Sequence, residues 1–141
     1  NIVAGLSMGG YGALKFALTK PENYFACISL SGAVDITRKN RPYNLALWRS
    51  LFDYSMESPD KLEGGEHDLY ALAEKCVKSG AELPKIYMWC GTEDTLISAN
   101  DRFHEHLDAL GVAHTYKTSE GDHSWQWWDM HIQGGLKNIL E

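Results

Sequence analysis

Cysteine is scarce in this chain of 141 residues, and its three copies form no pattern. Cys27, Cys76 and Cys90 are an odd, unclustered set without a C-x-x-C spacing. The first and third lie in apolar, strand-like runs, which is typical of buried, inert thiols. The histidines and cysteines also lack the ligand spacing of a zinc site. We therefore expect neither a metal nor a cofactor, and we expect a reducing, cytoplasmic location.

Basic residues are also few, and they are scattered. The chain has 13 Lys and Arg against 19 Asp and Glu, a formal net charge of −6. This balance argues against nucleic acid or an anionic membrane as a partner. Neither a signal peptide nor an apolar run of membrane-spanning length is visible. With 44% hydrophobic residues, the chain can bury the core of one domain.

The start of the chain lacks an initiator methionine. It begins Asn1-Ile2-Val3 and enters an apolar run at once, with no turn before it. We interpret residues 1–141 as a single, partial domain, the C-terminal portion of something longer. The strand expected at 1–6 would then expose an edge, which we expect to pair with the absent N-terminal portion or with a second copy of the chain.

Apolar runs and helical periodicities alternate along the sequence. This alternation predicts an α/β fold, a mainly parallel sheet of about four strands with helices on both faces. A helical excursion at about 35–80 either covers the active site or is a plain connection, and both interpretations stay open. The expected strands are 1–6, 25–31, 85–90 and 113–118, and the expected helices are 8–18, 44–52, 66–79, 99–110 and one from Trp125 or Trp128 to Leu140.

The most informative stretch is the G-x-S-x-G motif formed by Gly5, Ser7 and Gly9. It lies between an expected strand and an expected helix, the context of a nucleophile elbow. A serine at the apex of such a turn requires small residues two positions before and after it. The turn also points the positive end of the helix at any anion that forms beside the serine. The motif therefore predicts an acyl-transfer site with Ser7 as nucleophile.

A serine nucleophile needs a base and a carboxylate that orients the base. Asp94 follows the third expected strand and His123 follows the fourth, so both lie at the carboxyl ends of strands. The order serine, acid, histidine is that of α/β-hydrolases. We expect these two residues to complete a triad with Ser7, and the backbone N–H of Met8 to be one oxyanion donor.

Other acids and histidines compete for these roles. Asp35 follows the second expected strand and is the main rival acid. Asp122 adjoins His123 and cannot easily bend back to its ring, while His131, inside the last helix, could support the site from outside the triad. The remaining histidines are expected to be solvated side chains: His67, His104, His106 and His114.

Three segments together resemble a known family. They are residues 5–14 (GLSMGGYGAL), 91–94 (GTED) and 121–129 (GDHSWQWWD). They are similar to the tributyrin esterase branch of the esterase D and S-formylglutathione hydrolase family. The resemblance covers the whole chain and implies an α/β-hydrolase that cleaves short-chain acyl esters without a cofactor, with Ser7, Asp94 and His123 at the matching positions. Relatives include thioester hydrolases, feruloyl and acetylxylan esterases and mycolyl transferases.

The family also carries about as much chain again before this serine, including the loop that donates the second oxyanion N–H. The expected function is a serine carboxylesterase acting on a small acyl ester. The alternatives are an S-formylglutathione-type thioesterase, an acyltransferase, or a non-catalytic fragment without the N-terminal half. We expect Trp48, Leu96 and Trp125 to contact substrate, although an aromatic run at a helix start, here the tryptophans at 125, 127 and 128, is more typical of packing, which would brace the His123 loop.

Overall fold

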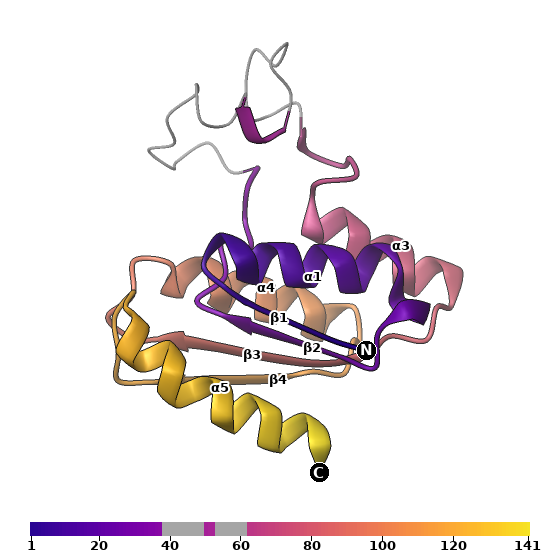
Figure 1. Cartoon of the computed structure of the whole chain (residues 1–141). Coiled ribbons are helices and arrows are strands. Elements are labelled where there is room, and N and C mark those ends of the chain that lie inside the picture. The colour runs from indigo at the N-terminus through magenta and orange to yellow at the C-terminus, as the bar shows by residue number, and fades with distance from the viewer. Residues whose placement is uncertain (38–49, 53–61) are drawn as a thin grey trace.

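Four parallel strands form one sheet in the computed structural model, which describes residues 1–37, 50–52 and 62–141 (Figure 1). The strand order follows the sequence, so each strand pairs with its successor. Much of the expected excursion lies outside the described residues, namely 38–49 and 53–61. These ranges include most of the helix expected at 44–52. The strands are β1 (Ile2–Leu6), β2 (Ala26–Leu30), β3 (Lys85–Gly91) and β4 (Thr115–Ser119).

Helices cover both faces of this sheet (Figure 1). On one face α1 (Met8–Thr19) packs on β1 and β2, and α4 (Ile97–Ala109) packs on β3. There α3 (Leu69–Ser79) packs against α1 and α4, so the end of the expected excursion belongs to this helical layer. On the other face α5 (Trp125–Leu140) packs on β2 and β3. A short 3₁₀ turn at Pro21–Asn23 follows α1. The predicted α/β fold is confirmed.

The central strands are buried on both sides, which explains their mainly apolar sequence. Successive side chains of a strand point to opposite faces. In β2, Cys27 joins the core under α1, α3 and α4, whereas Ile28 joins the core under α5. Phe103 of α4 and Trp128 of α5 are buried in these two cores respectively.

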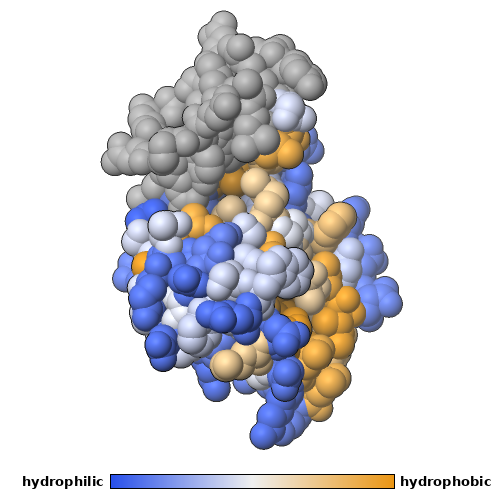
Figure 2. All heavy atoms as spheres, turned by 60° about the vertical axis from the view of Figure 1, so that its left-hand side comes forward, coloured by the Kyte–Doolittle hydropathy of each residue, from blue (hydrophilic) through white to orange (hydrophobic). Residues whose placement is uncertain are grey.

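The edge strand β1 has a different environment. It pairs with β2 on one side, and Ile2 is 42% exposed. Large exposed hydrophobic side chains also occur on α5, namely Met130, Leu136 and Leu140. Figure 2, in which the carboxyl ends of the strands come toward the viewer, shows hydrophobic residues gathered on one flank of the molecule. Within the described part of the chain, no helix combines the length and the apolar character needed to cross a membrane.

Three element starts differ from the sequence prediction by two or three residues. Helix α3 begins at Leu69 rather than 66, because the Asp68 side chain caps it by accepting the Tyr70 N–H at 3.0 Å. Helix α4 begins at Ile97 rather than 99, because the Asp94 turn leads directly into it: the Ile97 N–H donates to the Asp94 carbonyl at 3.1 Å. Strand β4 begins at Thr115 rather than 113, because Thr115 is the first residue in register with β3, opposite Tyr87.

Candidate active site

Ser7 occupies a strained turn between β1 and α1. Its backbone angles, a φ of 55° and a ψ of −121°, lie in a region that residues other than glycine rarely adopt. The turn is held by its own backbone: the Ser7 N–H donates to the Leu30 carbonyl at 2.9 Å, and the Ser7 carbonyl accepts from Gly10 at 3.0 Å and from Ala33 at 3.0 Å. A conformation of this kind persists only where its surroundings fix it.

The glycines around Ser7 have unequal importance. A Cβ on Gly5 would lie 2.1 Å from the Gly9 carbonyl oxygen, so the prediction of a required small residue is correct there. The same prediction is wrong for Gly9, because a Cβ added there would meet no described atom within 4 Å outside the backbone of its own helix and its chain neighbours. The tight position is Gly10, where a Cβ would meet Ser29 Oγ at 2.7 Å and the Cα of Gly32 at 2.9 Å. The rotation of the helix turns Gly10, not Gly9, toward the end of β2.

The structure brings Ser7, His123 and Asp94 together in one hydrogen-bonded line. His123 Nε2 lies 2.8 Å from Ser7 Oγ, and His123 Nδ1 lies 2.8 Å from Asp94 Oδ2. The Asp94 side chain is fully buried, while the ring of His123 is 33% exposed. With Nδ1–H donating to the carboxylate, Nε2 is the acceptor for the serine hydroxyl. The second Asp94 oxygen, Oδ1, accepts the Leu96 N–H at 2.8 Å and fixes the carboxylate.

Trp128 supports the histidine ring from α5. Its indole meets the ring of His123 edge to face, with centroids 4.8 Å apart and planes at 86°. The Trp128 Nε1–H donates to Ser31 Oγ at 3.0 Å, and Ser31, at the end of β2, has a φ of 48°. The indole therefore ties the ring of His123 to a second strained turn at the same end of the sheet.

The loop that carries Asp94 and the loop that carries His123 are joined directly. The Glu93 N–H donates to the Gly121 carbonyl at 3.0 Å, and the Gly121 N–H donates to Glu93 Oε2 at 3.1 Å. The hydroxyl of Thr92 also hydrogen-bonds to Glu93 Oε2. These donors, first the Thr92 hydroxyl and then the Gly121 N–H, lower the pKa of the Glu93 carboxyl. Sequence reasoning missed Glu93, although it adjoins the predicted acid.

The N–H of Met8, the predicted oxyanion donor, lies at the start of α1. Met8 is the first residue of α1, where helix N–H groups have no partner within the helix. No described residue accepts a hydrogen bond from this N–H. It therefore lies at the positive end of α1, directly after Ser7.

The predicted pocket residues have different environments. Leu96 is partly buried and packs against the core under α1, α3 and α4. Trp125 is 71% exposed at the start of α5, with its ring 5.6 Å from that of Trp128. Trp48 lies outside the described residues.

The rival acid Asp35 does not bind the His123 ring. Asp35 is buried, and Arg102 Nη2 lies 3.5 Å from its Oδ2. Asp122 accepts a hydrogen bond from the Ser124 hydroxyl at 2.5 Å. His131 stacks on Trp89, with ring centroids 4.0 Å apart, and its Nε2 lies 3.3 Å from Ser119 Oγ. Burial lowers the pKa of His131.

The prediction that four other histidines are solvated is wrong for His114, and the other three are only partly exposed. The side chain of His114 is only 2% exposed, and the side chains of His104 and His106 are 34% and 21% exposed. The Nδ1 of His67 lies 2.5 Å from Lys15 Nζ. Desolvation and the charge of Lys15 lower the pKa of His67 against a smaller opposing effect of Glu66. Each ring packs against a neighbouring segment that helical periodicity does not reveal.

A parallel sheet flanked by helices, with a serine at the β1–α1 turn hydrogen-bonded to a histidine, is the architecture of an α/β-hydrolase. The comparison with protein families agrees with this class. The Esterase family model matches residues 1–139, and the chain belongs to this family.

Several known proteins are similar to the chain. An acetyl esterase of Caldicellulosiruptor saccharolyticus is 33% identical over 97% of this chain and 53% of its own length. The fluorophosphonate-binding serine hydrolase FphF of Staphylococcus aureus, solved with bound substrate, has a TM-score of 0.88 at 30% identity, covering all of this chain and 54% of that one. The S-formylglutathione hydrolase FrmB of Staphylococcus aureus has a TM-score of 0.85 at 28% identity, with the same coverage. The chain thus spans about half the length of these relatives.

Proposed function

We propose that this chain carries the catalytic triad of a serine carboxylesterase that hydrolyses short-chain acyl esters. The observation that supports it is the continuous line from Asp94 through His123 to Ser7, with both hydrogen bonds at 2.8 Å. The acetyl esterase at 33% identity supports a small acyl group.

The geometry suits two-step acyl transfer. Ser7 Oγ attacks the ester carbonyl carbon while His123 Nε2 takes its proton, and Asp94 stabilises the imidazolium. The Met8 N–H donates to the oxygen that becomes negative. The imidazolium returns its proton to the departing alcohol, which leaves an acyl-serine. Water, deprotonated by His123, then releases the carboxylic acid and restores Ser7.

We propose that Trp125, Leu96 and Trp48 contribute to the substrate pocket. The exposure of Trp125 and its ring contact with Trp128, which itself touches His123, support a place for Trp125 beside the acyl or alcohol group. Trp125→Ala should then change the preference among p-nitrophenyl esters of increasing acyl length and leave the reaction of the smallest ester little altered.

The test is hydrolysis of p-nitrophenyl acetate and butyrate by the intact protein and its variants. Ser7→Ala and Asp94→Asn should each lower kcat by about 10³-fold or more. Ser98→Ala, an exposed serine on α4, is the matched control and should retain full activity. Equal rates for the wild type and Ser7→Ala would overturn the proposal in favour of a non-catalytic role.

The likeness to the hydrolase FrmB favours one second candidate, a thioesterase acting on S-formylglutathione. The same triad can cleave a thioester, so the two functions differ in the group that leaves. Comparison of kcat/KM for S-formylglutathione with that for simple oxygen esters separates them, and a strong preference for the thioester would replace the first assignment. Product analysis with an added alcohol would detect an acyltransferase.

We further propose that residues 1–141 form part of one domain whose β1 edge is covered by a preceding portion of chain or by a second copy. The exposure of Ile2 and the half-length coverage of the relatives support this. Intact mass and light scattering of the native protein would separate the two occupants, and rapid hydrogen exchange of the β1 N–H groups that point away from β2 would contradict either. The three buried free cysteines support a cytoplasmic setting.

A further inference from the structure

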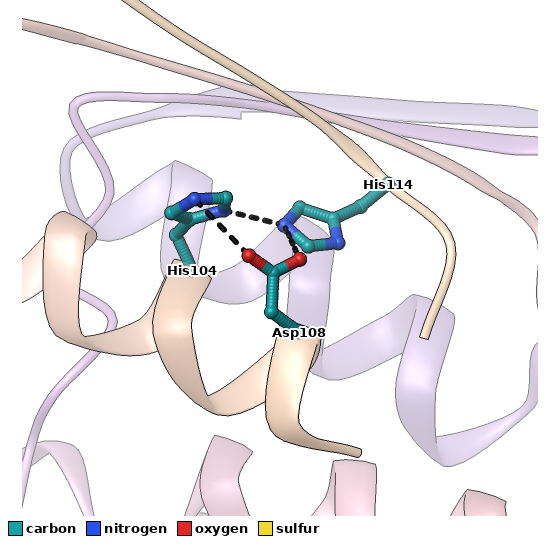
Figure 3. A group of neighbouring side chains, drawn as sticks. All are labelled: His104, Asp108 and His114. Atoms are coloured by element: carbon teal, nitrogen blue, oxygen red, sulfur yellow. Dashed lines mark hydrogen bonds and ion pairs between the residues drawn. The ribbon is translucent and has the colours of Figure 1, made fainter. Parts of the chain in front are cut away.

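A second cluster of chemically reactive side chains lies far from the triad. His104 and Asp108 are one helical turn apart on α4, and His114 lies in the turn before β4 (Figure 3). Helix α4 starts beside Asp94 at the carboxyl ends of the strands and runs back to the end where β4 begins. The cluster is therefore at the opposite end of the sheet from Ser7.

His114 is held with one nitrogen aimed into this cluster. Its side chain is 98% buried, and its Nδ1 donates to the Val112 carbonyl at 2.8 Å. The donation leaves the lone pair on Nε2, which lies 2.7 Å from His104 Nδ1 and 3.8 Å from Asp108 Oδ1. An imidazole with one nitrogen fixed by a backbone carbonyl and the other presented to a cation is the usual arrangement of a metal-binding histidine.

The cluster is short of positive charge. A neutral His104 has one ring proton, and when that proton lies on Nδ1 it is donated to His114 Nε2. The lone pair on His104 Nε2 then faces Asp108 Oδ2 at 3.4 Å. His114 Nε2 and Asp108 Oδ2 are thus both acceptors, and the single ring proton of a neutral His104 can be donated to only one of them. Either a second proton on His104 or a bound cation relieves this.

We propose that His104, Asp108 and His114 form a Zn²⁺ site. Two imidazoles and a carboxylate are a donor set that zinc prefers. Tetrahedral ligands about 2.0–2.1 Å from zinc are about 3.3 Å from one another. His114 Nε2 lies 2.7 Å from His104 Nδ1 and 3.8 Å from Asp108 Oδ1, two distances that bracket this value. One ligand atom from each of the three residues lies within 4.8 Å of the other two.

The exposure of the cluster suits an open fourth position. Asp108 is 62% exposed and His104 is 34% exposed, so water can reach the ion and complete its coordination. Zinc binds the lone pair of His104 Nδ1, so the single ring proton of a neutral His104 is then on Nε2, which faces Asp108. The ion would link the end of α4 to the start of the outer strand β4 and stabilise the fold without touching the triad.

The experiment is a zinc titration of the intact, chelator-treated protein in competition with a chromophoric chelator. The wild type should bind one zinc per chain at this cluster, with a rise in Tm of about 5–10 °C when zinc is 100-fold above its Kd. His104→Gln and Asp108→Asn should each weaken binding at least about 10-fold and remove the rise in Tm. His106→Gln, on the same helix but facing Tyr70 and Glu74, is the matched control.

Because His114 is buried, its replacement could prevent folding, so the result rests on the two more exposed ligands. Esterase activity of His104→Gln without zinc should equal that of the wild type, which shows a folded protein. A loss of zinc binding in His123→Gln would show that the metal binds at the triad and not at this cluster. The proposal is overturned if His104→Gln binds zinc as tightly as the wild type, or if only His123→Gln loses it.

Discussion

Gly91 and Gly121 approach each other so closely that a Cβ on Gly91 would lie 2.1 Å from the Gly121 carbonyl oxygen. Gly91 ends β3, and Gly121 lies in the loop after β4, with a φ of 151°. A Cβ on Gly121 would in turn lie 2.9 Å from the ring of Trp127. The contact sets the separation of the two loops that carry Asp94 and His123, and therefore the length of the hydrogen bond between these residues.

Gly91→Ala should consequently damage both stability and activity. The added methyl must displace backbone, which cannot yield as a flexible side chain does, at a cost of roughly 3 kcal/mol. The displacement moves His123 away from Asp94, so kcat should fall more than KM changes. Urea denaturation and p-nitrophenyl butyrate kinetics measure the two effects, and a variant with wild-type activity would show that this contact does not position the triad.

Glu93 should act as a positioning residue for the same pair of loops. Glu93→Ala removes the acceptor for the Gly121 N–H and should lower kcat/KM by about 10-fold, because small misplacements of catalytic groups are costly. Glu93→Gln keeps an acceptor oxygen and should restore most of the activity. Glu120→Ala, an exposed neighbour, is the control. Equal activity in all three variants would contradict the role.

The pH dependence of Glu93 has a definite sign. Its pKa is lowered in the folded protein. Its contribution to stability is therefore present above the ordinary glutamate pKa of about 4.3 and is lost as the pH falls through the lower folded value. Glu93→Gln should remove this part of the acid dependence of Tm.

Gly10 and Gly12 offer a matched pair on one helix. Gly10→Ala would press a methyl against Ser29 Oγ and Gly32 and should destabilise the protein by about 1–3 kcal/mol. Gly12→Ala meets no described atom within 4 Å and replaces glycine in a helix interior, so it should stabilise by about 0.5–1 kcal/mol. Opposite signs in urea denaturation are expected, and equal signs would show that the approach of α1 to β2 is less tight.

The fold and the triad geometry were within reach of sequence reasoning, because both depend on patterns along the chain. Strands buried on two faces produce unbroken apolar runs, as at 86–90. Ser7 follows β1 directly, and Asp94 and His123 lie in the loops just after β3 and β4. Parallel strands bring such positions to one edge of the sheet.

The missed features depend on which segments meet in space. Glu93 matters because the loops after β3 and β4 are adjacent, and Gly10 matters because of the direction in which one helical residue faces. The pairing of His104 with His114 joins a helix to the turn that follows it, and the spacing of histidines along the chain does not reveal such a contact. These interactions need the register of β4 and the rotation of each helix, which local patterns leave open.

The three cysteines should be unreactive in the folded protein. Burial raises the pKa of Cys27 and of Cys90 to about 12, and it also raises the pKa of Cys76. Since the thiolate is the reactive form, a disulfide reagent at pH 8 should modify none of them until denaturant is added. Unfolded cysteines ionise near 8.5, so stability should fall as the pH rises from about 8.5 toward 12. Rapid modification of the native protein would contradict the burial.

Trp128 should contribute to both stability and catalysis through two separable contacts. Trp128→Phe retains an aromatic edge beside His123 but removes the donor to the buried Ser31 hydroxyl, which should cost about 1–2 kcal/mol with little change in kcat. Trp128→Ala removes the ring as well, should cost about 3–5 kcal/mol, and should lower kcat because the histidine ring loses its support. Trp125→Phe, at an exposed position, controls for stability. If Trp128→Ala kept the wild-type kcat at a temperature where it remains folded, the hydrogen bond from His123 to Asp94 alone would suffice to orient the base.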